Sequence, residues 1–375
     1  MNGTAPIEQS ADRPVDLAID LSVIIVTYNS RDLTLACVRS VVSDRRGMRS
    51  GATAPAARTE LPSPDLMPAP PDLMPAPPDL MPASPDLMPI TSELIVVDNA
   101  STDGTAAAVA ALAPDARVLV QASNGGFARG NNAGLAAARG RYLLLLNSDT
   151  EVQPGALAAL VAFMDTHPEA GACGPTLLNP DGSLQPSGRD LPTVLSLFLD
   201  MTRLHRLWRR NLYAQAGRDY SEAAAVGELS AAALLVRRTV YEQVGGLDPA
   251  FFAYYEDVDW CKRIGAAGWR IYYVPAAQVM HHWQGTSRQV SELAYAAGQD
   301  SARYYFRKHH GAAAALAVQG MLIAKESALL LAAALRRDPP GRSLHRRMLR
   351  RAILPLQGAQ AAPAAAQAAS GQVQP

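Results

Sequence analysis

Short apolar runs that end in polar residues most constrain how this chain can fold. Residues 21–26 read Leu-Ser-Val-Ile-Ile-Val, residues 93–98 read Glu-Leu-Ile-Val-Val-Asp, and residues 142–146 read Tyr-Leu-Leu-Leu-Leu. Such runs are typical of strands that are buried on both faces of a parallel sheet. Helices are expected between them, over about 30–43 and over 105–112. This alternation predicts a doubly wound α/β sheet with right-handed crossovers.

Polar residues follow the carboxyl ends of the predicted strands. A further strand is expected at 117–121, followed by a glycine-rich loop at 124–134 and a helix from there to about Arg139. In open sheets of this kind, ligands bind outside the carboxyl ends of the strands. We therefore expect the functional site at that edge. The polar residues there are Thr27, Asn29, Asp98, Asn124, Asn147 and Asp149.

A proline repeat separates the first two predicted strands. Residues 64–70 read Pro-Asp-Leu-Met-Pro-Ala-Pro, and the seven-residue period recurs through 71–77, 78–84 and 85–91. Because each repeat carries two or three prolines, a helix cannot continue through it. We expect the segment from about 44 to 91 to be an extended, mostly disordered insertion. Its role stays open between a neutral linker or loop and a polyproline-type docking motif.

Composition limits the classes of function. Hydrophobic residues make up 49% of the 375 residues, enough to bury a large core in roughly two or three domains. The 34 Lys and Arg balance 34 Asp and Glu, so no net charge draws the chain to nucleic acid. Cys37, Cys173 and Cys261 lack zinc-ligand spacing and argue against a disulfide framework. No basic and apolar leader is visible at the N-terminus, so we expect a cytoplasmic protein.

Five stretches of the chain form a set. Three of them extend over the ends of predicted strands: 22–29 (Ser-Val-Ile-Ile-Val-Thr-Tyr-Asn), 95–104 (Ile-Val-Val-Asp-Asn-Ala-Ser-Thr-Asp-Gly) and 146–150 (Leu-Asn-Ser-Asp-Thr). The others are 124–132, within the glycine-rich loop, and 244–263, which contains Tyr-Glu-Asp-Val-Asp-Trp. In this order they resemble glycosyltransferase family 2, the inverting GT-A enzymes that use nucleotide sugars, and specifically its rhamnosyltransferase-like branch.

The resemblance and the sequence pattern together imply a domain organisation. An N-terminal tail at 1–20 precedes a GT-A domain at 21–290, which the insertion at 44–91 interrupts. A helical C-terminal extension follows at 291–355, and a disordered tail at 356–375. The implied fold is the GT-A fold, a mostly parallel, doubly wound, Rossmann-like sheet flanked by helices.

The resemblance implies a divalent cation, Mg²⁺ or Mn²⁺, on the diphosphate of the donor. Asp149 at a strand end is a hard oxygen ligand that suits either ion, and Asn147 occupies the first position of the family's Asp-x-Asp motif. Asp149 could instead cap a turn or helix before Pro154. Either His281 or His282 could complete the metal site, where an imidazole suits Mn²⁺ better than Mg²⁺. Purely structural histidines are the alternative.

The resemblance also implies contacts to the nucleotide sugar. Asp98 would contact the base or ribose, unless it only forms an Asx turn onto Ser101. The residues at 27–29 would line the base pocket or serve as turn residues. Arg129 would face the diphosphate, with glycines allowing the backbone to approach it, unless the segment is an ordinary glycine-rich turn. The implied contacts are Thr27, Tyr28, Asn29, Asp98, Asn124, Arg129, Asn132, Asn147 and Ser148.

Acid–base chemistry is implied for the acidic cluster at 256–259. By resemblance, Asp257 is the catalytic base that takes the proton of the acceptor hydroxyl, and Glu256 flanks the acceptor or orients the base. Asp259 would begin a helix whose first turn favours carboxylates. An acidic first turn without a catalytic role is the alternative. Ala231 stands where related sequences carry glycine, so its methyl group would narrow the acceptor wall.

The C-terminal extension combines an apolar segment with a basic one. Residues 312–335 are rich in Ala and Leu, but polar residues such as Lys325 and Glu326 interrupt them too often for a transmembrane helix. Residues 203–210 are similarly basic and apolar. Two interpretations stay open: a peripheral contact with an anionic membrane surface, and a packed helical subdomain with a solvated basic face. The arginines concerned are Arg336, Arg337, Arg342, Arg346, Arg347, Arg350 and Arg351.

These expectations combine into one function and its competitors. By resemblance, the chain is a metal-dependent inverting transferase that moves L-rhamnose from dTDP-rhamnose onto a saccharide or lipid-linked saccharide in cell-surface polysaccharide assembly. The alternative donor is a UDP-hexose or UDP-galactofuranose. A nucleotide-sugar-binding scaffold without catalysis is a different class, and it would need no base such as Asp257. A dinucleotide oxidoreductase is disfavoured because no Gly-x-Gly-x-x-Gly follows the first strand.

Overall fold

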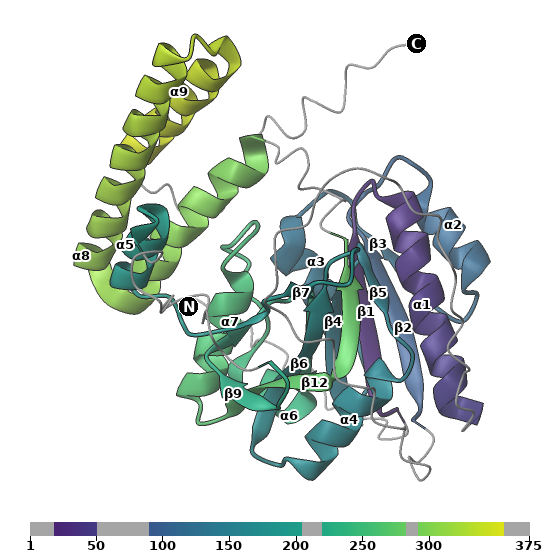
Figure 1. Cartoon of the computed structure of the whole chain (residues 1–375). Coiled ribbons are helices and arrows are strands. Elements are labelled where there is room, and N and C mark those ends of the chain that lie inside the picture. The colour runs from purple at the N-terminus through teal and green to yellow at the C-terminus, as the bar shows by residue number, and fades with distance from the viewer. Residues whose placement is uncertain (1–18, 51–89, 205–219, 283–291, 356–375) are drawn as a thin grey trace, which may run out of the picture.

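The computed structural model describes residues 19–50, 90–204, 220–282 and 292–355 (Figure 1). The predicted C-terminal tail at 356–375 lies outside the described residues, as do most of the N-terminal tail at 1–20, most of the proline-rich insertion and most of the basic stretch at 203–210. The predictions of disorder for the insertion and for the tails therefore stay predictions.

Twelve strands and nine helices build the part of the chain that the structure describes. The strands are β1 (Leu21–Thr27), β2 (Ser92–Asp98), β3 (Arg117–Val120), β4 (Tyr142–Asn147), β5 (Thr150–Val152), β6 (Ala170–Leu178), β7 (Leu184–Gln185), β8 (Gly188–Arg189), β9 (Ala224–Val226), β10 (Glu228–Leu229), β11 (Ala233–Arg237) and β12 (Arg270–His281). The helices are α1 (Arg31–Ser50), α2 (Thr105–Leu112), α3 (Gly126–Ala137), α4 (Ala156–Thr166), α5 (Val194–Met201), α6 (Arg238–Val244), α7 (Glu256–Ala266), α8 (Glu292–Leu335) and α9 (Pro339–Ile353).

Ten of these strands form one sheet in the order β3-β2-β1-β4-β11-β6-β12-β5, with β7 beside β6 and β9 beside β12. Strand β1 is parallel to both β2 and β4, and β2 is parallel to β3. Strand β11 runs antiparallel to its neighbours β4 and β6. The sheet is therefore mixed. The strands β3, β2, β1 and β4 are parallel to one another, as the sequence predicts, and carry their carboxyl ends to one edge. Of the pairings that involve the later strands, only that of β12 with β6 is parallel among the described residues.

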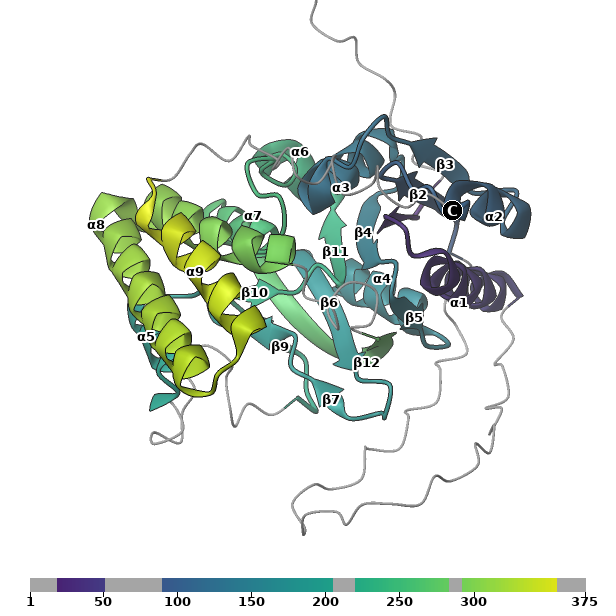
Figure 2. The ribbon, with the colours of Figure 1, turned by 90° about the horizontal axis from the view of Figure 1, so that it is seen from above.

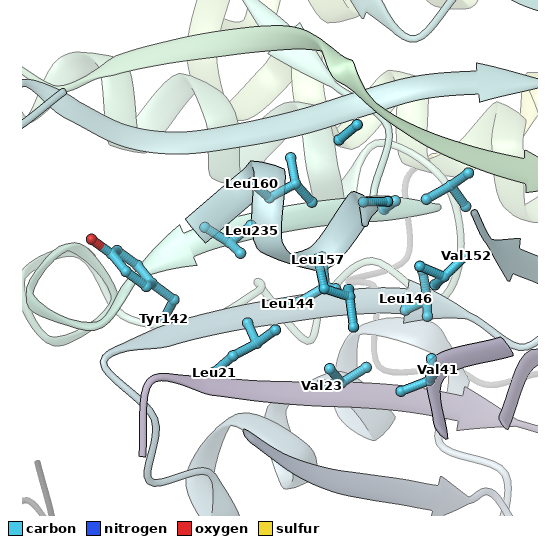
Figure 3. Packing of buried hydrophobic residues seen from close by; sticks show 14 of the residues in the cluster. Leu21, Val23, Val41, Tyr142, Leu144, Leu146, Val152, Leu157, Leu160 and Leu235 are labelled. Carbon is cyan, nitrogen blue, oxygen red and sulfur yellow. The ribbon is translucent and has the colours of Figure 1, made fainter. Parts of the chain in front are cut away.

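Helices cover both faces of the sheet. On one face α1, α2 and α4 pack on the strands, and Figure 3 shows Leu157 of α4 beside Leu144 of β4. On the other face α3, α6 and α7 contribute buried residues such as Leu135 and Trp260. This two-sided burial explains why the central strands read as continuous apolar runs. The predicted arrangement of a central sheet flanked by helices is confirmed. The three cysteines are buried and form no disulfide within the described residues.

The first helix is longer than the sequence pattern predicts. It does not end near Ser43 but continues to Ser50, so the insertion does not begin at 44. Tertiary contacts hold this part of the helix. The Asp44 carboxylate accepts a hydrogen bond from the backbone N–H of Leu157 at 3.1 Å, and the Arg45 guanidinium donates to the Ser92 hydroxyl at 2.9 Å.

The expected glycine-rich loop at 124–134 is mostly helix, and that prediction was wrong. Helix α3 begins at Gly126, so Arg129 and Asn132 lie on a helix. The glycines serve close packing of this helix on the sheet. A Cβ atom on Gly130 would lie 2.7 Å from Val26 Cγ1, and one on Gly134 would lie 2.3 Å from Ile24 Cγ2. The sequence pattern could not separate this use of glycine from a turn.

The C-terminal extension is helical, as predicted, and packs beside α5 at the side of the sheet remote from α1 (Figures 1 and 2). Helix α8 bends at Gly311, where φ is 86°, and α9 returns along it. The segment Ala294–Leu335 is long and apolar enough to cross a membrane by length and composition, although Lys325 and Glu326 interrupt it. Soluble helical domains contain such helices too, so length and composition alone do not assign this segment to a membrane.

Tight helix–sheet contact gives a stability prediction. We expect Gly134→Ala to lower the melting temperature by a few degrees, because overpacking costs about 1–3 kcal/mol. Gly320→Ala is the matched control: this glycine lies inside α8, and nothing within 4 Å would meet its Cβ. The control should have a free energy of unfolding up to about 1 kcal/mol higher, because alanine has the higher helix propensity. Equal thermal melting curves for the two variants would contradict the packing argument.

Candidate active site

The loops after β1 and β2 are tied together at the carboxyl edge of the sheet. Asn29 adopts a left-handed backbone (φ 47°), and its Oδ1 accepts a hydrogen bond from the Thr102 N–H at 2.8 Å. Asp98 Oδ1 accepts from the Ser101 N–H at 2.8 Å, so the Asx turn considered for Asp98 is present. One carboxylate oxygen of Asp98 thus shapes the loop. A nucleotide contact of this residue stays a prediction.

The other predicted residues of this edge lie close by. The buried Thr27 hydroxyl is 2.9 Å from the Ser30 hydroxyl, which is 3.3 Å from the Ser148 hydroxyl. The loops that follow β1 and β4 therefore meet. Tyr28 is 40% exposed beside them, so its ring is available at the surface of the edge.

A cavity of about 420 Å³ opens beside this edge, between the end of β3 and the start of α3. It is lined by Asn99, Gln121, Ser123, Arg129 and Asn132, among others. Asn99 is 3% exposed and donates from Nδ2 to the Gly126 carbonyl. Its buried Oδ1 has no hydrogen-bond partner among the described residues. An uncompensated buried acceptor beside a cavity is suited to a ligand that donates a hydrogen bond.

Two predicted ligand contacts are used by the protein itself. Asn124 Oδ1 accepts from the Gly126 N–H at 3.0 Å, at the start of α3. The Asn132 amide makes two bonds with the backbone of Leu247, at 2.7 and 2.9 Å. These asparagines fix loops around the cavity. Asn99 was missed, because a lone Asn after a strand carries no signal of a cavity.

The structure distinguishes the two histidines that the sequence left open. His281 Nε2 lies 3.3 Å from Asp149 Oδ1, whereas His282 Nε2 lies 2.6 Å from Glu151 Oε1. Only His281 therefore faces the predicted metal ligand.

Gln185, which the sequence did not single out, orients His281. Its Nε2 donates to Asn179 Oδ1 at 3.0 Å, which turns its Oε1 toward His281 Nδ1 at 2.7 Å. In this network the hydrogen of a neutral imidazole is assigned to Nδ1, so that Nε2 presents its lone pair toward Asp149. A carboxylate oxygen and an imidazole nitrogen that face each other form a donor set that fits Mn²⁺.

The chemistry of the strand end supports this fit. Asn147, two residues before Asp149, has a buried Oδ1 without a hydrogen-bond partner among the described residues. No group of three or more His, Cys, Asp or Glu side chains in the described ranges could hold a metal. The protein residues would thus supply only part of a coordination shell, and a ligand could supply the rest.

Asp257 lies in the first turn of α7, preceded by two strained residues. Tyr254 and Tyr255 adopt left-handed backbone conformations, with φ of 66° and 67°. Non-glycine residues in this region each cost about 1–3 kcal/mol and often mark functional sites. Backbone N–H groups of Val258 and Ala231 donate to the two Asp257 carboxylate oxygens at 2.9 and 3.1 Å.

Burial sets the protonation of this carboxylate pair. Desolvation raises the pKa of Asp257 above its ordinary value, while the bonds from Ala231 and Val258 and the charge of Arg189 act in the opposite direction. Burial and the neighbouring Asp257 raise the pKa of Glu256 well above its ordinary value. Glu256 Oε2 is buried without a hydrogen-bond partner in the described part of the chain. A raised pKa makes a carboxylate a better proton acceptor at neutral pH.

A short backbone bridge connects the two halves of the site. The Asn147 N–H donates to the Ala232 carbonyl at 3.0 Å, and the adjacent Ala231 N–H holds Asp257. The end of β4 and the carboxylate of α7 therefore lie on either side of one dipeptide. Ala231 is buried, and its contact with Asp257 is made by its backbone N–H. Helix α7 begins at Glu256 and not, as the sequence predicted, at Asp259. Asp259 lies in its first turn, and its carboxylate contacts Arg263 and His309 of α8.

Comparison with known proteins places this geometry in a family context. A family model described as "Glycosyl transferase family 2" matches residues 89–245. An N-acetylglucosaminyl-diphospho-decaprenol L-rhamnosyltransferase of Mycobacterium tuberculosis (strain ATCC 25618 / H37Rv) is 35% identical over 226 residues, which cover 56% of this chain and 70% of that protein. The O-antigen biosynthesis protein RfbC of Myxococcus xanthus is 30% identical over 169 residues, 42% of this chain and 12% of that protein.

Solved structures show more distant similarity. The mannosyltransferase PcManGT from Pyrobaculum calidifontis, in complex with GDP-Man and Mn²⁺, aligns with a TM-score of 0.45 and 16% identity over 91% of this chain and 89% of that chain. GalNAc-T7 with UDP, GalNAc and Mn²⁺ aligns with a TM-score of 0.47 and 15% identity over 78% of this chain and 48% of that chain.

Proposed function

The chain belongs to glycosyltransferase family 2, and from this premise we propose that it transfers a sugar, L-rhamnose from dTDP-rhamnose as the first choice, to a saccharide or lipid-linked saccharide acceptor. The family and the rhamnosyltransferase relative support a glycosyltransferase of polysaccharide biosynthesis. The donor is proposed because that relative is named as an L-rhamnosyltransferase with a lipid-diphosphate-linked sugar in its name. A UDP-hexose or UDP-galactofuranose donor is the alternative.

One observation carries the catalytic part of this proposal. The buried Asp257 carboxylate is joined through the dipeptide Ala231–Ala232 to the strand end that bears Asn147 and Asp149. A candidate proton acceptor, Asp257, thus lies close to the end of β4, where the diphosphate is proposed to bind. This is the arrangement that a direct displacement at an anomeric carbon requires.

In the proposed reaction the acceptor oxygen attacks the anomeric carbon as the bond from that carbon to the diphosphate oxygen breaks. Asp257 takes the proton of the acceptor hydroxyl, and the leaving nucleoside diphosphate carries away the bond electrons. A single displacement inverts the anomeric configuration. Asp149 and His281 would hold a Mg²⁺ or Mn²⁺ ion, which neutralises the charge of the diphosphate.

The nucleotide is proposed to bind at the cavity beside Asn99. The unpartnered Asn99 Oδ1 can accept the N3–H hydrogen of a pyrimidine base, a feature that thymine and uracil share. Arg129 lines the same cavity and supplies a positive charge for a phosphate. These contacts would suit either a dTDP-sugar or a UDP-sugar.

The tip of the α8–α9 hairpin supports a contact with an anionic membrane surface. Leu331 and Leu335 are 62% and 77% exposed there, and Arg336, Arg337 and Arg342 are exposed beside them. None of these arginines forms an ion pair with a carboxylate in the described part of the chain. Apolar and cationic side chains together complement an anionic bilayer. Such a contact would bring a cytoplasmic enzyme to a lipid-linked acceptor.

The first test is nucleotide release from a panel of dTDP- and UDP-sugars with Mn²⁺ or Mg²⁺ and lipid-linked acceptors. We expect turnover by the wild-type protein and a fall of kcat of about 100-fold or more for Asp257→Asn, because the amide cannot accept the proton. Asp115→Asn, at a carboxylate that is 61% exposed, is the control and should retain the wild-type rate. If the wild-type protein turns over no donor, the proposed enzymatic function is wrong. If the Asp257→Asn variant keeps the wild-type rate, only the assignment of the base is wrong.

The second test separates the two histidines. We expect His281→Ala to weaken Mn²⁺ binding about tenfold or more in calorimetry with the nucleoside diphosphate present. His282→Ala is the matched control and should change it less, because His282 faces Glu151. A larger loss for His282→Ala would reverse the assignment.

The third test concerns the hairpin tip. In sedimentation with phosphatidylglycerol vesicles, we expect the double change Arg336→Glu and Arg337→Glu to weaken binding about tenfold or more, since each arginine near an anionic surface contributes about 1 kcal/mol. Arg39→Glu, on the exposed face of α1, is the control. Unchanged binding by the double variant would refute the contact. Wild-type protein that resists alkaline extraction from native membranes would instead indicate an integral helix.

A further inference from the structure

Four contacts join the first part of α8 to the segment that carries Asp257. Figures 1 and 2 both place this part of α8 beside α7. The Ser301 hydroxyl donates to the Ala253 carbonyl at 2.8 Å, and the Tyr305 ring lies 5.4 Å from the Tyr255 ring. His309 Nε2 lies 2.6 Å from Asp259 Oδ1. Lys308 Nζ also lies 2.6 Å from that oxygen.

The strained turn before α7 needs such support. Tyr254 and Tyr255 hold left-handed conformations that relax unless their surroundings fix them. Ser301 fixes the carbonyl that precedes the turn, and Tyr305 packs on its second residue. Both groups come from α8, about 50 residues further along the chain. The backbone conformation that presents Asp257 is therefore stabilised by the C-terminal extension.

The second contact region between α8 and α7 surrounds the buried Asp259 carboxylate. Its side chain is fully buried, two residues beyond Asp257 in the same helical turn, and it pairs with Arg263 of its own helix at 2.8 Å. Across the interface it meets Lys308 and His309. Burial of a carboxylate is costly unless charged partners surround it, so the interface holds α7 in one position.

His309 contacts both Asp259 of α7 and Tyr305, the residue that packs against the strained turn. Its Nε2 faces Asp259, and its ring centroid lies 4.9 Å from that of Tyr305, which in turn packs on Tyr255. Lys308 lacks this second contact and reaches instead to Asp248 at 2.7 Å. His309 is thus the residue through which the first turn of α7 and the strained turn before it are coupled.

We propose that His309 is a positioning residue for the Asp257 carboxylate, and that the helical extension completes the active site. His309 does not contact Asp257 itself. It holds Asp259 and Tyr305, and these two fix the helix start and the left-handed turn on either side of Asp257. The proposal rests on the proposed function of Asp257 as the base.

Steady-state kinetics with the full-length chain test the proposal. For His309→Ala we expect kcat to fall about tenfold or more while the KM for the nucleotide sugar stays within about twofold, because small displacements of a reacting group slow the chemical step. In His309→Gln the side-chain amide can still donate to Asp259, and we expect it to recover most of kcat. Arg307→Ala, at an exposed arginine of the same part of α8, is the control, and we expect its kcat to be unchanged.

Hydrogen exchange supplies a readout that does not need activity. In His309→Ala and in the milder Ser301→Ala we expect faster exchange at residues 254–258, with unchanged exchange in β1 and β2. Wild-type kcat and unchanged exchange at 254–258 in both variants would overturn the proposal. A wild-type chain that turns over no donor would refute the proposed function, yet faster exchange at 254–258 would still support the positioning role.

Discussion

Strand β1 lies between β2 and β4, and its parallel register with both places Thr27 beside Asp98 and Val26 beside Asn147. Every side chain of β1 is buried, so a slip of one residue would exchange the side chains that face the two helical layers. The register is therefore strongly fixed. Because the three strands end at one edge, the loops that follow them meet there. The packing of apolar residues along the strands therefore determines where the hydroxyls and carboxylates of the site lie.

This dependence explains which parts of the molecule could be predicted from sequence. Runs buried on both faces are easily recognised, so β1, β2 and β4 and the polar residues after them, such as Asp98 and Asn147, were located within about one residue. The parallel order of these strands followed from the alternation with helices. The acidic cluster at 256–259 was singled out by its resemblance to the family, and the structure places Glu256 and Asp257 in the first turn of α7.

Long-range contacts account for what the sequence did not predict. Gly130 and Gly134 looked like turn residues, and only the approach of Val26 and Ile24 reveals that they allow a helix to lie close to the sheet. The orientation of the His281 ring depends on Gln185, almost a hundred residues away in sequence. The α8 contacts with Ala253 and Asp259 have no local signature at all. Periodicity reports which face of an element is buried, but not what it is buried against.

The site is built from groups that the fold must stabilise from elsewhere. Asp257 and Glu256 are buried carboxylates with raised pKa values, so at neutral pH their burial opposes folding relative to an unfolded chain in which they ionise freely. The left-handed residues before them add strain of the same sign. Buried side chains of α7, such as Trp260 and Ile264, offset part of these costs. The buried ion pairs of Asp259 with α8 lie directly beside them. The contacts of α8 with α7 therefore stabilise the folded state of the turn that carries Asp257, independently of any role of the extension in binding a partner.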